Sequence, residues 1–372
     1  MSLLINNNLK YYTEKFNKED SCYELINRDK KNDIIRVKYP LEILDDYTED
    51  DFDIYFFTNY QIKENDIFQV CEKNSERVGW IFPLIALSSK DHSYVDNEHF
   101  LKYASVTFKK LIRNNNGFIL KTIPDPPGGS YDLIDLYDGD LIVFTVCKDK
   151  INEDFRISDY IPSFYSYGYY HLDMKQQKID LNNYKAITES EFKTYRYKEF
   201  SEKIIHIKPV SNFFIEHLYI RELFTNLLKI ENNPILRFLF LYQVIEILIE
   251  SIFISEAKEI LIKVGENKID YYNFQSTLND LNKEAKRINI LFSQCVKETS
   301  NFVSMISSSE KLLINFFEVK SDIFVSEAIY KVRNLIIHNY SKLLKYEKLM
   351  EDIVKYFEFL VIDVLHSIEM NK

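Results

Sequence analysis

Hydrophobic positions follow one period before residue 209 and another after it. Up to about residue 200, short runs of apolar and β-branched residues are separated by turn residues, which predicts β-strands. The strand-like runs are residues 33–39, 54–57, 77–87, 104–108, 118–122 and 140–147. Residues 97–111 also carry a helical pattern, which would place 104–108 in a helix. The tyrosine-rich run 163–170 is expected to be a loop or an edge strand.

From Pro209 onward the 3.6-residue period of an amphipathic helix takes over. The predicted helices span residues 211–230, 234–255, 274–297, 307–317, 322–339 and 342–369, with 255–272 as a connection. Ser211 and Asp322 are candidate N-caps, and Pro234 suits a first helical turn. The expected fold class is therefore α+β. A β-rich domain over residues 1–205, sandwich-like or barrel-like, precedes an all-helical bundle over residues 206–372.

The helix predicted for residues 322–339 carries an apolar stripe that should face the core. Its members are Phe324, Val325, Ala328, Ile329, Val332, Leu335 and Ile336. At about 100° per residue, Arg333 and His338 fall on opposite flanks of this stripe, while Asn334 and His338 lie one turn apart. Tyr330 and Ile337 fall on the face away from the core. An apolar residue there predicts a second buried surface, covered by a partner helix.

The residues Arg333, Asn334 and His338 have the chemistry that a metal-free ribonuclease uses. Histidine exchanges protons near neutral pH, and arginine binds phosphate with a planar fork of donors. The pattern Arg-Asn-x-x-x-His resembles the motif of the HEPN superfamily, in which an arginine, often followed by Asn, Asp or His, precedes a histidine. Residues 234–246 resemble the long early helix of the ApeA-like branch of that superfamily. The resemblance covers about residues 206–372.

This resemblance implies a function and a set of site residues. It implies an RNA endonuclease that needs no cofactor or metal, with a catalytic site built where two motif helices meet in a homodimer. Arg333, Asn334 and His338 would be catalytic. Glu246, on a helix packed near the motif, would orient Arg333 or His338, and Tyr330 and Asn339 would support them.

The family also implies a biological role and leaves alternatives open. Its members serve as toxins, CRISPR effectors and anti-phage abortive-infection proteins, so a gate is expected. Residues 1–205 would be a sensor that binds an antitoxin, an RNA or a phage-derived trigger. One alternative is an inactive HEPN scaffold that binds RNA or a partner protein. Others are a helical dimerisation domain attached to an unrelated enzyme, or a structural role in which His338 caps the helix and Arg333 pairs with an acid.

Composition narrows the protein class. The chain has 372 residues, 46% of them hydrophobic, which suffices for two cores. Only 7 Gly and 8 Pro argue against a Gly-rich phosphate loop. The net charge of −10, with the acidity mainly before residue 205, excludes a protein that coats nucleic acid broadly, although a local basic cleft remains compatible with an RNase.

Cysteine and apolar patterns bear on the compartment. Cys22, Cys71, Cys147 and Cys295 are far apart and lack zinc spacing, so free thiols in a reducing, cytoplasmic compartment are expected. The first residues show no signal-peptide pattern. Residues 235–254 are apolar but contain Arg, Gln and two Glu, which predicts a buried bundle helix and no membrane span. Acidic clusters at 45–53 and 132–140 are expected to be solvated loops.

Overall fold

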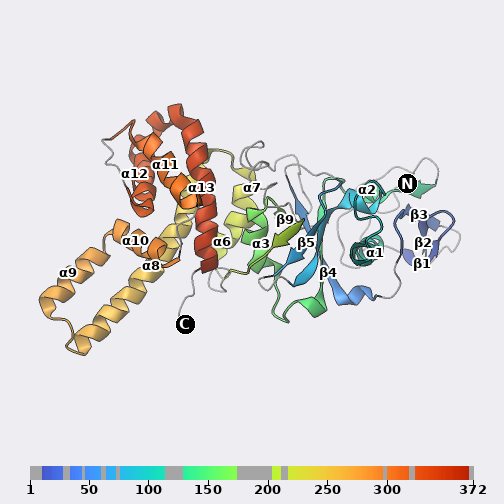
Figure 1. Cartoon of the computed structure of the whole chain (residues 1–372), viewed down its shortest axis with the longest axis horizontal. Helices are drawn as coiled ribbons and strands as arrows, with labels where there is room; N and C mark the ends of the chain where they lie inside the picture. Colours follow the sequence, from blue (N-terminus) through green and yellow to red (C-terminus); the bar gives the residue numbers. More distant parts are fainter. Residues whose placement is uncertain are drawn as a thin grey trace. The chain divides into compact units, whose positions relative to one another are not determined.

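The computed structural model of the chain is shown in Figure 1. It describes residues 11–27, 34–43, 47–59, 64–72, 76–113, 129–173, 203–210, 217–295, 300–317 and 323–367. The chain divides into two compact units, Met1–Lys208 and Pro209–Lys372. The first is β-rich and the second is helical, so the predicted α+β class is confirmed. The division lies close to the expected boundary at residue 205.

The first unit contains two sheets. The smaller has the order β1-β2-β3-β7, formed by β1 (Tyr11–Asn17), β2 (Cys22–Asn27), β3 (Ile34–Lys38) and β7 (Ser130–Tyr131). The larger has the order β10-β5-β6-β8-β4-β9, formed by β10 (Ile204–His206), β5 (Phe68–Cys71), β6 (Arg77–Pro83), β8 (Ile142–Cys147), β4 (Phe52–Thr58) and β9 (Tyr170–Leu172). The pairings are antiparallel except β3 with β7 and β5 with β10.

Both faces of the larger sheet are covered, which explains why every residue of β8 is buried. On one face Val143 joins a core that includes α1 (Glu98–Arg113) and residues of the smaller sheet. On the other face Phe144 and Val146 join a core with Phe164 of α3 (Ile157–Ser166). A strand buried on both faces has no polar alternation, and this is the continuous apolar pattern of residues 141–147.

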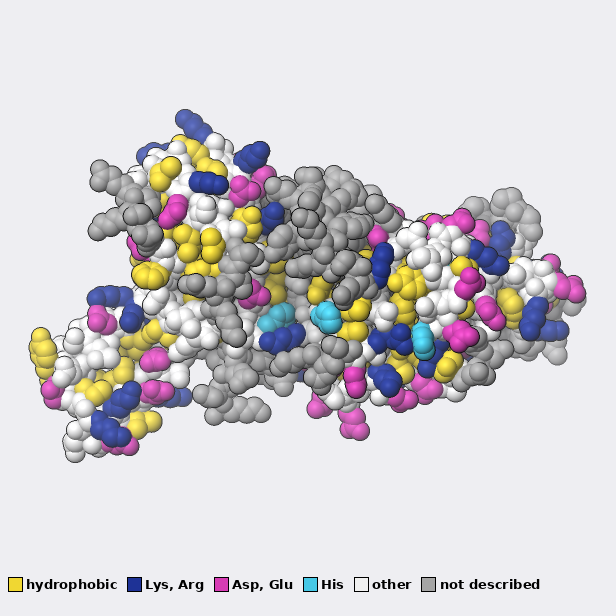
Figure 2. Space-filling view, viewed as in Figure 1, with side chains coloured by type: hydrophobic (Ala, Val, Ile, Leu, Met, Phe, Trp, Pro, Cys, Tyr) yellow, Lys and Arg dark blue, Asp and Glu magenta, His cyan; other side chains and the backbone are white. Residues whose placement is uncertain are grey.

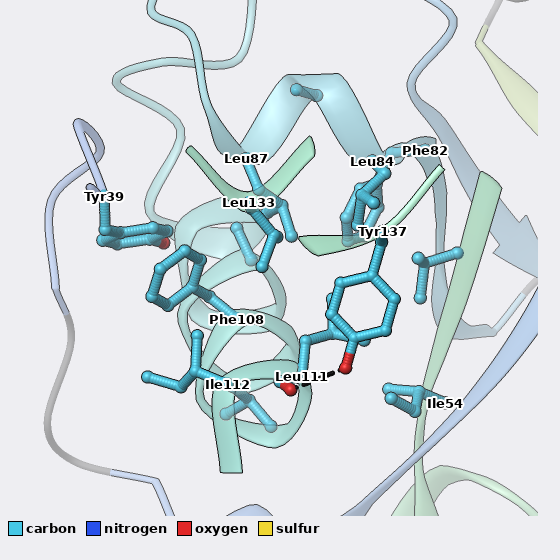
Figure 3. Packing of buried hydrophobic residues seen from close by; sticks show 14 of the residues in the cluster. Tyr39, Ile54, Phe82, Leu84, Leu87, Phe108, Leu111, Ile112, Leu133 and Tyr137 are labelled. Carbon is cyan, nitrogen blue, oxygen red and sulfur yellow. Dashed lines mark hydrogen bonds between the residues drawn. The ribbon is translucent and has the colours of Figure 1, made fainter. Parts of the chain in front are cut away.

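Helix α1 is the centre of the first core (Figure 3). Its residues Phe108, Leu111 and Ile112 pack under Leu133, which lies on the short helix α2 (Leu133–Leu136). The Tyr137 hydroxyl donates a 2.7 Å hydrogen bond to the Leu111 carbonyl. Residues 104–108 are therefore helical, as the alternative reading allowed. Short 3-10 turns η1 (Glu49–Asp51), η2 (Leu84–Leu87) and η3 (Lys148–Lys150) complete this unit.

The tyrosine-rich segment 163–170 has a different structure from the one predicted. Residues 163–170 were expected to be a loop or edge strand, but most of them lie in α3 and the turn after it. Tyr165, Tyr169 and Tyr170 are buried, because their rings pack into the unit. The strand predicted at 118–122 lies outside the described residues.

The second unit is built from helices. They are α6 (Leu218–Glu222), the π-turn η6 (Leu223–Leu227), α7 (Leu228–Ile230), α8 (Pro234–Gly265), α9 (Tyr271–Leu281), α10 (Glu284–Cys295), α11 (Ser300–Leu313), α12 (Val325–Leu343), the 3-10 turn η7 (Leu344–Tyr346) and α13 (Glu347–Ser367). Several predicted bounds were wrong, including the end of α12 at Leu343 instead of 339 and the start of α13 at Glu347 instead of 342. Helix α8 runs ten residues past 255, the segment 274–297 is two helices, and α11 begins at 300 instead of 307.

Helix α8 changes character along its length. Pro234 occupies its first turn, as predicted, and the Asn233 side chain accepts hydrogen bonds from the Ile235 and Leu236 amides. Up to Ile249 the helix packs mainly into the bundle, whereas after Glu250 it forms an arm with α9 (Figure 1), and hydrophobic side chains lie on the surface of this arm (Figure 2). Leu261, Tyr271 and Tyr272 are among its exposed residues. By length and composition α8 also meets the criteria for a membrane span, a test that core helices of soluble proteins pass too.

A buried ion pair joins α8 to α13. Arg237 Nη2 lies 2.5 Å from Glu358 Oε1, and both side chains are almost completely buried. Arg237 Nη1 also donates to the carbonyls of Leu228, the first residue of α7, and of Glu231, the residue that follows α7. Arg237 therefore ties three segments together, and it holds the inner half of α8 in the bundle.

Candidate functional site

Helix α12 positions the predicted catalytic residues. It packs against α8, α10 and α11. Six of the seven residues of the predicted stripe are buried, which confirms the stripe for them. Phe324 is the exception: it is the N-cap residue and is 71% exposed, because the helix begins only at Val325. The candidate caps Ser211 and Asp322 lie outside the described residues.

Arg333 lies where α12 faces α8. Its Nη2 is 3.5 Å from Oε1 of Glu246, and its Nη1 donates a 3.1 Å hydrogen bond to Oδ1 of Asn334. The guanidinium carbon lies 5.6 Å from the centre of the Tyr242 ring, within the range of a cation–π contact. The structure thus brings Arg333, Asn334 and Glu246 together, and of the contacts considered for Glu246 it forms the one with Arg333.

The guanidinium of Arg333 is only partly satisfied. Its side chain is 24% exposed, and its Nε is buried without a hydrogen-bond partner among the described residues. The ion pair with Glu246 is long, and the Glu246 side chain is itself 34% exposed. Partly exposed pairs of this kind are weak, so an incoming phosphate can displace the carboxylate.

Two residues that sequence reasoning missed fix this arrangement. The Tyr242 hydroxyl donates a 2.7 Å hydrogen bond to Oε1 of Glu284 on α10. Burial, followed by this bond to a carboxylate, raises the pKa of Tyr242, so the phenol stays protonated as a donor. Tyr242 precedes Glu246 by one helical turn, which is a signal that the sequence offered. Nothing in the sequence pointed to Glu284.

Gln243 holds the other oxygen of the Glu246 carboxylate. Its Nε2 donates a 2.6 Å hydrogen bond to Glu246 Oε2. Glu246 therefore makes its contacts with Arg333 and Gln243, and none with His338. Of the two roles expected for Glu246, its geometry fits the orientation of Arg333.

His338 lies apart from Arg333 within one chain. The imidazole is exposed, and in the described part of the chain neither Asn334 nor any other side chain hydrogen-bonds to it. The next residue, Asn339, has φ −136° and ψ 29°, which breaks the regular helix directly after His338. Asn339 and Tyr330 are half-buried, and no side-chain hydrogen bond joins either to the motif within the described ranges.

The arrangement supplies two separate chemical groups. The partly exposed guanidinium of Arg333 can bind an oxyanion, and an exposed imidazole can exchange protons. Among the described residues, no three His, Cys, Asp or Glu side chains are placed to hold a metal ion. The four cysteines are free, and all but the half-buried Cys295 are buried.

No family model, no curated protein and no solved structure matches this chain. The geometry of α8, α10 and α12 therefore carries the functional argument.

Proposed function

We propose that the chain is a metal-independent endoribonuclease of the HEPN type, acting in the cytoplasm as a toxin or anti-phage effector. The observation that carries the proposal is the cluster at Arg333. Its guanidinium is held by Tyr242, Asn334 and Glu246 while its Nε keeps a free donor, on the same helix as the exposed imidazole of His338. A purely structural arginine would be expected to have all its buried donors paired.

The chemistry uses the nucleophile that RNA itself carries. A base accepts the proton of the 2′-hydroxyl, whose oxygen attacks the adjacent phosphorus, and an acid donates a proton to the departing 5′-oxygen. The products are a 2′,3′-cyclic phosphate and a 5′-hydroxyl. Arg333 would neutralise the charge that develops on the phosphate, and Asn334 would orient Arg333 for that contact. Cleavage of DNA is not expected, because DNA lacks the 2′-hydroxyl.

One chain supplies one motif histidine, whereas this reaction needs an acid and a base. We therefore propose a homodimer in which His338 of each copy fills one role. Ile337 and Tyr340, which flank His338, are 50% and 41% exposed, so α12 offers an apolar surface beside the imidazole. A strict monomer at micromolar concentration would contradict this part of the proposal.

The β-rich unit would act as the gate. It forms a compact unit with its own cores, as expected of a module that binds an antitoxin or a phage-derived trigger. If so, a chain lacking residues 1–208 should lose regulation and should cleave RNA or harm cells without a trigger. Identical regulated activity in the shortened chain would argue against a sensor role.

The first test is cleavage of tRNA, rRNA and mRNA in EDTA, with the product ends mapped. Wild-type protein should leave cyclic phosphates, and His338→Ala should lose activity by at least a hundredfold while remaining folded. His99→Ala, which changes an exposed histidine on α1, is the matched control and should behave as wild type. Near-wild-type cleavage by His338→Ala would exclude the assigned catalytic residue.

If neither the wild-type protein nor any variant cleaves RNA in vitro, the next test is toxicity in cells. An RNase held by its gate should become toxic when its trigger is expressed with it, and His338→Ala should abolish that toxicity. Equal effects of wild type and His338→Ala would favour a scaffold that binds RNA or a partner protein.

A further inference from the structure

A second arginine repeats the environment of Arg333 one turn further along α8. Glu250 follows Glu246 by four residues, so the two carboxylates lie on the same face of α8, roughly 5–6 Å apart at Cβ. Glu246 faces Arg333 of α12, and Glu250 faces Arg287 of α10, with 3.4 Å from Arg287 Nη1 to Glu250 Oε2. The two arginines therefore lie in a row along this face.

The two guanidinium groups are held in the same way. Each lies against an aromatic ring of α8: Arg333 against Tyr242, and Arg287 at 5.5 Å from the centre of the Phe253 ring. Each has a buried Nε without a hydrogen-bond partner in the described part of the chain. The Arg287 side chain is 18% exposed, so its rim still reaches solvent.

The carboxylate opposite Arg287 is poorly placed to hold it permanently. The Glu250 side chain is 63% exposed, and the contact to Arg287 is long. An ion pair with an exposed partner contributes little to stability. A phosphate can offer the same guanidinium two parallel, charge-assisted hydrogen bonds, which are stronger.

Further hydrogen bonds fix α10 relative to the motif helix. The Tyr242 hydroxyl binds Glu284, one turn before Arg287, and the Ser326 hydroxyl of α12 lies 3.2 Å from Asn289 Oδ1 of α10. Arg287 is thus kept close to the surface that presents Arg333.

We infer that Arg287 is a second phosphate-binding residue, which holds an RNA phosphate next to the one that Arg333 contacts, and that Glu250 occupies it when RNA is absent. This inference rests on the proposed ribonuclease function and deepens it. The ligand is single-stranded RNA, whose successive phosphates can each contact one of two guanidinium groups whose carboxylate partners lie one turn apart on α8. Arg287 thereby determines which phosphate of the strand reaches Arg333.

The test measures RNA affinity in the full-length, cleavage-deficient His338→Ala protein. A fluorescently labelled single-stranded RNA oligonucleotide is titrated by anisotropy over a series of KCl concentrations. Removing one phosphate contact lowers the slope of log affinity against log salt by about 0.7 for a single strand. Arg287→Ala and Arg333→Ala should each lower the slope by about that amount and weaken binding about tenfold at low salt.

The direction in which Glu250→Gln changes RNA affinity decides between the two roles of Arg287. Because Glu250 is on the surface, this variant should fold normally. If Arg287 binds phosphate, removing its competitor should tighten RNA binding several-fold without lowering the salt slope. If Arg287 only joins α10 to α8, Glu250→Gln should leave RNA affinity unchanged. Lys268→Ala, which removes an exposed charge beyond the end of α8, is the control and should not change the slope.

The outcomes separate this inference from the function on which it rests. A lower slope for Arg333→Ala, with no effect of Arg287→Ala or Glu250→Gln, would overturn the role of Arg287 and leave the ribonuclease proposal standing. An unchanged slope for Arg333→Ala, together with no cleavage by wild type, would count against the ribonuclease itself.

Discussion

At the scale of a single residue, the buried imidazole of His92 joins the loop before α1 to the turn η2 by a hydrogen bond. His92 Nε2 lies 3.1 Å from the Ala86 carbonyl, and His92 Nδ1 accepts a 3.2 Å hydrogen bond from the Tyr94 amide. Nδ1 therefore has no proton, and Nε2 donates. Burial lowers the pKa of His92 below its usual value near 6.5, and the hydrogen bond to Ala86 offsets this only in part. These two hydrogen bonds account for the burial of His92, so its role is structural.

We expect His92 to make the β-rich unit sensitive to acid. Because the folded-state pKa is lower than the unfolded one, the unfolded chain binds the proton more readily, and stability is lost as the pH falls below about 6.5. Urea unfolding monitored by Trp80, the single tryptophan, reports on this core, since Trp80 is fully buried 5.2 Å from the Tyr94 ring.

The comparison uses His92→Gln and His99→Gln. His92→Gln should be less stable than wild type at pH 7.5, and this difference should shrink at pH 5.5. His99→Gln, at an exposed position on α1, should follow the wild-type pH dependence. A constant difference between His92→Gln and wild type at both pH values would contradict the assignment.

At the site, the sequence predicted the residues that can be recognised from their chemistry and their spacing along one helix. Arg333, Asn334 and His338 follow from a motif within one helix, and Glu246 was drawn from the resemblance of its helix. Asn334 and His338 lie one turn apart but form no hydrogen bond with each other, because the Asn334 side chain accepts one from Arg333. Glu284 and Arg287 were missed, because their roles arise only when α10 packs against α8, and side-chain spacing along one helix carries no information about that packing.

At the scale of an element, strand β6 needs a glycine at the point where it pairs with β8. A Cβ on Gly79 would lie 2.2 Å from the Thr145 carbonyl oxygen, and that oxygen belongs to backbone that cannot move independently. The close approach lets β6 and β8 pair in the middle of the larger sheet.

We therefore expect Gly79→Ala to destabilise the β-rich unit by about 2 kcal/mol or more, because the two strands must separate. Gly139→Ala is the matched control, since a Cβ at Gly139 meets no atom within 4 Å. The measurement is the free energy of unfolding from Trp80 fluorescence. Equal stability of the two variants would exclude the predicted clash.

The packing of α8 against α13 depends on the buried ion pair of Arg237 with Glu358. Removing either charge would leave the other buried without its counter-ion. Arg237→Met should destabilise the helical unit by about 3–5 kcal/mol, because the Glu358 carboxylate would stay buried without its cation. Adding Glu358→Leu should recover part of the loss, since it removes that uncompensated charge. Thermal unfolding followed by far-ultraviolet circular dichroism measures both effects. A double variant no more stable than Arg237→Met would contradict this explanation.

Element boundaries were harder to predict than element types. The apolar run that indicated α8 ends near 255, and the helix continues because residues 256–264 still favour helix and contain no Gly or Pro. The helix ends at Gly265, with Glu266 as the C-cap, and Asn267 then takes the left-handed conformation (φ 56°) that terminates it. Strands β1, β2 and β5 were missed because their sequences mix polar and apolar residues, and their pairing depends on partners elsewhere in the chain.

At the scale of the whole molecule, buried and half-buried tyrosines make the stability of both units depend on pH under alkaline conditions. Burial raises the pKa of Tyr55, Tyr103 and Tyr219 to about 12 each, from an ordinary value of 10. The first two belong to the β-rich unit and the third to the helical unit. In the unfolded chain these phenols ionise near pH 10.

The stability that these protonated phenols contribute is fully present below pH 10 and is lost as the pH rises toward 12. We expect both units to unfold in this window, with tyrosinate absorbance rising together with the loss of circular dichroism. Tyr103→Phe should extend the stable range of the β-rich unit. Ionisation of all tyrosines near pH 10 without loss of structure would contradict the role of burial.

The two halves of helix α8 should differ in local stability. The ion pair of Arg237 with Glu358 holds the inner half in the bundle, whereas in the outer half, from about Ser251 to Gly265, Ile260 is the one buried residue and the others are exposed or half-buried. Opening of the outer half disrupts few buried contacts, so its amides should exchange with deuterium long before those near Phe238 do. The same continuous helix should therefore behave as two kinetic segments, and a protease should cut the arm while the bundle stays folded.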